Sequence, residues 1–120
     1  MQKRLSGVVF AAPQDEEYNG MAHLWVRDAE TAYWLSLTRA VDSDDIEVMV
    51  SDHLNYVGAD PTVILSSTEI VIKVSTVAAR ALDGYFEYAV AFHPESQDLS
   101  SIRRTLEVIF RDKAGLVIDT

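Results

Sequence analysis

The chain has 120 residues, of which 48% are apolar, and this composition suits one globular domain (residues 1–120) rather than a disordered or fibrous chain. Nineteen acidic against ten basic residues give a formal net charge of −9, which disfavours binding to nucleic acid or to anionic membranes. The chain has no cysteine, which excludes disulfides, thiolate metal sites and thiol nucleophiles.

The N-terminus superficially resembles a signal peptide, because two basic residues precede a short apolar run. Ser6 and Gly7 interrupt that run, which favours a first β-strand over residues 7–12. No apolar stretch in the sequence approaches the roughly 20 residues that a membrane-spanning helix needs. We therefore expect a cytoplasmic protein that does not bind membranes.

The first half of the chain predicts short strands, in which β-branched and aromatic residues lie between turn-forming clusters. After the strand at 7–12, these are residues 22–27, 33–39 and 45–50. Along 33–39 apolar and polar side chains alternate, which is typical of a half-buried antiparallel strand. In the fourth strand the same alternation directs Ile46 and Val48 inward and Glu47 into solvent.

The second half predicts a hairpin of residues 62–65 and 69–74 around the polar turn at 66–68. The alanine-rich stretch 75–82 indicates a short helix with Ser75 or Thr76 as its N-cap and Gly84 as its end. A strand at 85–92 follows.

Apolar residues then recur at helical spacing between residues 97 and 112, which indicates an amphipathic helix. Residues 116–118 either add an edge strand or pack against the core. These elements together predict an α+β fold. It has a mainly antiparallel sheet of about six to seven strands, with one short and one longer C-terminal amphipathic helix packed on it. The strand order and the oligomeric state stay open.

Acidic residues are concentrated in the middle of the chain, where no lysine or arginine occurs between Arg39 and Lys73. A run of this kind is either a solvated face that keeps the protein soluble or a surface for a basic partner. The candidate partner-binding residues are Asp42, Asp44, Asp45, Glu47, Asp52 and Asp60.

The sequence shows no motif of a catalytic or cofactor site. His23, His53 and His93 lie far apart and form no metal-binding pattern. There is no nucleophile elbow, and the isolated glycines match no phosphate-binding loop. We therefore expect no enzyme activity, no catalytic or metal-ligating residues and no cofactor.

Two tryptophans leave a choice between a structural and a binding role. Trp25 and Trp34 lie on the strand faces opposite Leu24 and Leu35. Because tryptophan carries a large apolar surface and is usually well buried, we favour a core position for both. If they are exposed instead, they are candidate anchors for a partner.

Six short segments have the order and spacing of a known family. They are Tyr-Trp-Leu-Ser-Leu-Thr-Arg at 33–39, Ile-Glu-Val at 46–48 followed by Asp52, and the apolar stretches 63–65, 70–74, 78–82 and 106–110. In these segments the chain resembles the immunity protein 10 family of bacterial polymorphic toxin systems. It departs from the family's pattern at Thr38 and His53, where glutamine is expected, and at 56–58, where Tyr-Gly-Gly is expected.

The resemblance implies a cytosolic protein that binds and neutralises a cognate toxin without catalysis. Toxins that act on nucleic acid are usually basic, so an acidic inhibitor would be steered to a basic toxin domain. The alternative is an acidic secretion or folding chaperone that binds an export substrate. Such a chaperone should be a dimer that holds its client unfolded, whereas an immunity protein should bind a folded partner.

Overall fold

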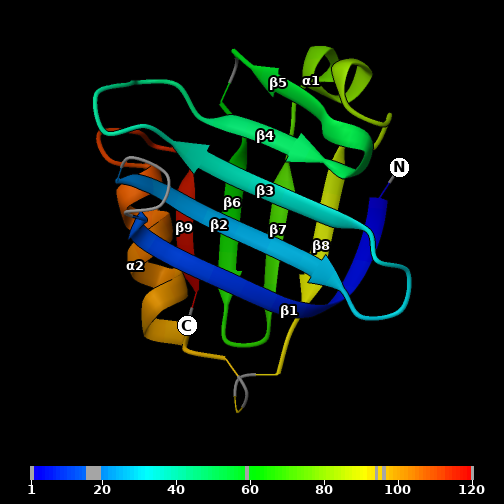
Figure 1. The fold of residues 1–120 in the computed structure, drawn as a ribbon, viewed down its shortest axis with the longest axis horizontal. Coiled ribbons are helices and arrows are strands. Elements are labelled where there is room, and N and C mark those ends of the chain that lie inside the picture. Colours follow the sequence, from blue (N-terminus) through cyan, green and yellow to red (C-terminus); the bar gives the residue numbers. More distant parts are fainter. Residues whose placement is uncertain (1, 16–19, 59, 94, 96, 120) are drawn as a thin grey trace.

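The described residues form one mixed sheet of nine strands, which folds over into two layers (Figure 1). The structure is a computed structural model that describes residues 2–15, 20–58, 60–93, 95 and 97–119, without the side chains of residues 14, 15 and 52. The strand order is β5-β4-β3-β2-β1-β8-β7-β6-β9. In Figure 1 the strands of the front layer cross those of the back layer at a steep angle.

The front layer is an antiparallel meander that follows the chain order. It consists of β1 (Gln2–Asp15), β2 (Met21–Asp28), β3 (Trp34–Arg39), β4 (Glu47–Val50) and β5 (Leu54–Val57). A single 3-10 turn, η2 (Ser51–His53), connects the last two strands.

The back layer contains two strand pairings that join distant parts of the chain. Strands β6 (Thr62–Ser66), β7 (Glu69–Lys73) and β8 (Glu87–Ala91) are antiparallel neighbours. Strand β9 (Leu116–Asp119) runs parallel to β6, and the first residues of β1 run parallel to β8. Strand β1 therefore belongs to both layers.

Gly7 lies where β1 passes from one layer to the other. The parallel pairing with β8 ends at Ser6, and the antiparallel pairing with β2 begins at Gly7. A Cβ atom on Gly7 would lie 2.1 Å from the carbonyl oxygen of Arg27, closer than any real contact allows. Glycine is therefore required for the close backbone approach at this bend.

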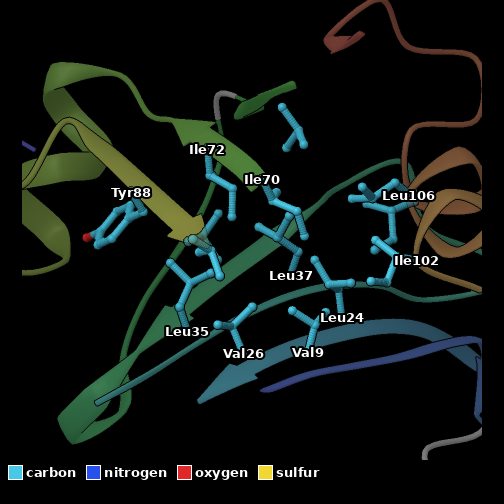
Figure 2. Packing of buried hydrophobic residues seen from close by; sticks show 14 of the residues in the cluster. Val9, Leu24, Val26, Leu35, Leu37, Ile70, Ile72, Tyr88, Ile102 and Leu106 are labelled. Atoms are coloured by element: carbon cyan, nitrogen blue, oxygen red, sulfur yellow. The ribbon is translucent and has the colours of Figure 1, made fainter. Parts of the chain in front are cut away.

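The core fills the space between the two layers, and alternate residues of most strands point into it (Figure 2). The front layer contributes residues such as Leu24, Val26 and Leu35, and the back layer contributes Ile70 and Ile72, all of them fully buried.

Two helices complete the domain. The short helix α1 (Thr76–Ala81) begins at Ser75, whose side chain accepts a hydrogen bond from the Ala78 amide at 3.1 Å. The longer helix α2 (Leu99–Ile109) begins at Asp98 in the same way and packs against β1 and β2. Its apolar side, which includes Ile102 and Leu106, covers one end of the core (Figure 2). No helix in the described part of the chain is long and apolar enough to cross a membrane.

The α+β class, the short helix and the longer amphipathic helix are confirmed, but the predicted sheet is wrong in size and kind. The observed sheet has nine strands and is mixed, whereas six to seven mainly antiparallel strands were expected. Strand β5 escaped prediction because three of its four side chains are exposed, so it has no apolar alternation. The two parallel pairings join segments about 50 to 85 residues apart, and local patterns carry no information on such partners.

Candidate partner-binding surface

Most of the predicted acidic residues lie at one end of strand β4. Asp42 and Asp44 lie in the turn between β3 and β4, Asp45 follows them, and Glu47 is the first residue of β4. Strand β5 ends opposite Glu47, at Val57, so Asp60 follows from the same end of the layer.

Asp52 is separated from the other predicted residues. It lies in η2, which follows the last residue of β4, whereas Asp45 and Glu47 lie at the first. Its side chain is outside the described part of the structure, so its role in partner binding stays a prediction.

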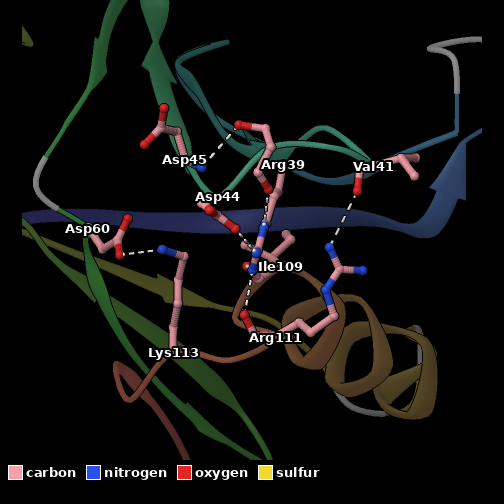
Figure 3. A network of polar contacts seen from close by, with 9 residues as sticks. Arg39, Val41, Asp44, Asp45, Asp60, Ile109, Arg111 and Lys113 are labelled. Atoms are coloured by element: carbon pink, nitrogen blue, oxygen red, sulfur yellow. Dashed lines mark hydrogen bonds and ion pairs between the residues drawn. The ribbon is translucent and has the colours of Figure 1, made fainter.

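Two of these carboxylates are paired with basic residues (Figure 3). Asp44 lies 3.5 Å from the Arg39 guanidinium, and Asp60 lies 2.7 Å from the Lys113 ammonium. Lys113 comes from the C-terminal region, which the sequence pattern could not connect to the acidic run. Part of the apparent negative surface is therefore neutralised by tertiary contacts.

The other described carboxylates remain available to a partner. Asp42 and Asp45 are exposed, and their carboxylates have no hydrogen bond or ion pair within the described residues. Glu47 accepts one hydrogen bond, from the Asn55 side-chain amide at 2.8 Å. Asp45 and Glu47 border a shallow hollow of about 220 Å³ with Thr38 and Val57. We call Asp42, Asp45 and Glu47 the acidic rim.

The outer side of the front layer carries large apolar side chains next to the acidic rim. The pairing register aligns Phe10, Trp25, Ser36 and Met49 in one row across strands β1 to β4. The adjacent row on the same side contains Thr38, Glu47 and Val57, which border the hollow. Exposure is 49% for Phe10 and 57% for Val8, its neighbour on this side of β1. We call Val8, Phe10, Trp25, Trp34 and Met49 the outer aromatic face.

The predicted core position of the two tryptophans is wrong. Trp25 and Trp34 are half-buried on the outer aromatic face and take no part in the core. Leu24, Val26 and Leu35 fill the inner side of the same strands, and period-two alternation forces the tryptophans to the opposite side. Neither α1 nor α2 covers that side of the front layer in Figure 1.

Two of the histidines contact the aromatic residues of this side. The His23 ring lies 6.2 Å from that of Phe10, and the His53 ring lies 5.7 Å from that of Trp34 in an edge-on arrangement. Within the described residues, no group of three or more histidine, aspartate or glutamate side chains is placed to hold a metal ion. These histidines extend the aromatic surface.

A second polar cluster lies at the other end of the domain, beside helix α1. Tyr33 and Tyr88 both donate hydrogen bonds to the Asp83 carboxylate. Burial, and then the hydrogen bond to Asp83, raise the pKa of both tyrosine hydroxyls far above their usual value. Lys3 lies 4.6 Å from the centre of the Tyr33 ring. Because both hydroxyls stay protonated as donors, the cluster suits a structural role better than acid–base chemistry.

Sequence reasoning missed Arg39, which is almost fully buried. Its guanidinium donates to the carbonyl oxygens of Ile109 at 2.9 Å, Arg111 at 2.6 Å and Ser43 at 2.9 Å (Figure 3). The first carbonyl belongs to the last residue of α2 and the second to a residue just beyond the helix, where carbonyl groups without a partner in the helix need such donors. An arginine at the end of a strand pattern carries no signal for this role.

No protein-family model, curated protein or solved structure matches this chain. Its function therefore has to be inferred from the chemistry of its own surface.

Proposed function

We propose that this chain is a non-catalytic binding protein of the immunity type, which neutralises a basic toxin domain. The outer aromatic face forms the centre of the contact, and the acidic rim forms its charged border. The observation that carries the proposal is the direct adjacency of the two. The row of Phe10, Trp25 and Met49 lies next to the row that contains Glu47.

The apolar part of this surface supports binding to a protein. Tryptophan is enriched among the residues that dominate binding energy, and such residues gather near the middle of an interface. A sheet side with two half-buried tryptophans and an exposed phenylalanine offers several anchors at low entropic cost. Exposed apolar patches of this kind are typical of interaction sites.

The charge of the surface supports a basic partner. The net charge of −9 attracts a basic domain over a long range, and the exposed carboxylates of Asp42 and Asp45, which make no ion pair within the described residues, lie at the border of the contact. Electrostatic attraction of this kind raises association rates more than it raises affinity. A toxin that binds nucleic acid must carry such a basic surface.

Affinity capture from the native host, with matched variants, tests the apolar centre. F10S should remove the captured partner, and F86S should retain it, because Phe86 is similarly exposed (43%) but precedes β8 in the back layer. A truncated anchor should weaken binding by about 2 kcal/mol, or roughly thirtyfold. Equal retention by both variants contradicts the proposed surface, as does a captured partner that is acidic.

The association rate tests the acidic rim. D45K/E47K should slow association with the captured partner by about tenfold at low salt and flatten its salt dependence. The control E30K/D119K makes the same change in net charge at exposed positions outside the rim, so it separates the effect of position from that of total charge. Asp44 is left unchanged because it is paired with Arg39. Equal slowing by both variants would refute a localised rim.

The size and state of the complex separate an immunity protein from a chaperone. A one-to-one complex with a folded, basic partner whose toxicity is lost on binding is the expected result. A dimer of this chain that holds an unfolded client would replace the proposal with the chaperone function.

A further inference from the structure

A cavity of about 310 Å³ lies between α2 and the ends of strands β1 to β3, outside the proposed partner-binding surface. Three of its lining residues are Arg39, Arg104 and Arg111, although the chain has only ten basic residues in all. The rest of its wall is largely apolar and includes Ala22, Val41 and Val108. Such a cavity is at the small end of the range for ligand sites.

Two of these arginines make few or no hydrogen bonds to the described part of the chain. Arg104 has no hydrogen bond or ion pair within the described residues. Arg111 makes one long hydrogen bond, 3.4 Å from its guanidinium to the Val41 carbonyl oxygen (Figure 3). Each guanidinium has five N–H donors in a planar arrangement that matches a carboxylate or a phosphate.

Arg39 contributes a fixed positive charge to the wall of the cavity. It is held in place by the three carbonyl oxygens that it contacts, and among the described residues its ion pair is with the fully exposed carboxylate of Asp44, at 3.5 Å. A ligand there would meet the rigid Arg39 side chain beside two arginines with few contacts in the described part of the chain, so little conformational freedom would be lost at Arg39 on binding.

We propose that this cavity binds a carboxylate group on a short apolar chain. The guanidinium groups of Arg104 and Arg111 hold the carboxylate, and the wall of Ala22, Val41 and Val108 contacts the alkyl part. A monoanion is favoured over a phosphate dianion for two reasons. The whole chain is negative, and the cavity lies beside the C-terminal end of α2, where the helix dipole disfavours added negative charge.

Calorimetric or NMR titration with small probes tests the site. Butyrate should bind saturably with a Kd on the order of 1 mM. Its neutral analogue butyramide should not bind, and inorganic phosphate should bind more weakly than butyrate. No saturation with butyrate up to tens of millimolar, or tighter binding of phosphate, would overturn the assignment.

Arg103 and Arg104 form a matched pair for mutation. R104A should weaken butyrate binding by about tenfold, since a hydrogen-bonded ion pair is lost. R103A should leave it unchanged, because Arg103 is next to Arg104 on α2 but is paired with Glu107 at 3.7 Å and does not line the cavity. Urea titration should show near-normal stability for both variants. Equal weakening by the two would show that only overall charge matters and would refute the site.

N-acetylvaline distinguishes the two sources of such a carboxylate. Tighter binding of N-acetylvaline than of butyrate identifies the C-terminus of a polypeptide as the ligand. Tighter binding of butyrate identifies a free short-chain acid. Loss of either signal in R104A supports the site, and an R104A variant that binds both probes normally overturns it.

Discussion

The two ends of the domain are closed by buried or half-buried charged groups of opposite sign. At the end covered by α2, the guanidinium of Arg39 donates to carbonyl groups of the chain. At the other end, the carboxylates of Asp83 and Asp28 accept hydrogen bonds from the chain. Asp28 accepts from the Ser6 amide at 2.9 Å and the Thr31 amide at 3.1 Å, next to the bend in β1.

The difference between the ends lies in the charges that remain unpaired. The carboxylates of Asp28 and Asp83 each accept at least two hydrogen bonds, which stabilises the fold and leaves little for a ligand. At the α2 end the Arg39 guanidinium donates three hydrogen bonds, whereas within the described residues Arg104 makes none and Arg111 makes one. Charged groups with several hydrogen bonds inside the protein therefore have a structural role. Charged groups beside a cavity that make few such bonds are candidates for ligand binding.

Removal of Arg39 should have the largest effect on stability. R39M keeps the apolar stem but leaves the carbonyl groups of Ile109 and Arg111 without their donor. We expect a loss of about 3 kcal/mol in the free energy of unfolding, measured by urea titration. Hydrogen exchange should show faster opening of the last turn of α2. If R39M is as stable as the exposed control R103Q, Arg39 does not connect β3 to α2.

A change at Asp83 should have an intermediate effect. D83N removes the charge that holds two tyrosine hydroxyls, so we expect a loss of about 1.5 kcal/mol in the free energy of unfolding. The variants Y33F and Y88F should each cost less than D83N, because one hydroxyl still reaches the carboxylate. D119N, at an exposed position in β9, serves as the control. A neutral effect of D83N would mean that solvent satisfies these hydroxyls equally well.

A change at Asp28 should have the smallest effect and should depend on pH. Hydrogen bonds from the Ser6 amide, and then from Thr31, hold the pKa of Asp28 below its ordinary value of 3.8. The folded state therefore binds its proton less readily than the unfolded state. This stabilisation is present above pH ~4 and is lost as the pH falls through the lowered pKa.

D28N should therefore be less stable than the natural chain by about 1 kcal/mol at pH 7, and this difference should shrink at acidic pH. Thermal unfolding of both proteins at pH 7 and pH 3 measures it. The control D42N, at an exposed carboxylate without a described partner, should match the natural chain at both values. A difference that stays constant with pH would assign the effect to packing instead.

Patterns in the sequence predicted the elements whose side chains alternate between core and solvent. The strands around Leu35 and Ile70 and the helix that contains Leu106 are of this kind, because burial forces a period of two or of 3.6. The same alternation already placed Trp25 and Trp34 opposite the core residues. The general preference of tryptophan for burial then led to the wrong prediction that both side chains lie in the core.

By itself, the sequence determined the α+β class, both helices, the excess of negative charge and the base-free acidic run. These properties are local, so neighbouring residues suffice to specify them. Only the tertiary structure decided which acidic residues are neutralised, since Lys113 reaches Asp60 across 53 positions. It also decided that β1 and β9 complete the sheet through parallel pairings, and that Arg39 contacts the end of α2. These contacts join segments that are far apart in the sequence, so a local sequence pattern cannot predict them.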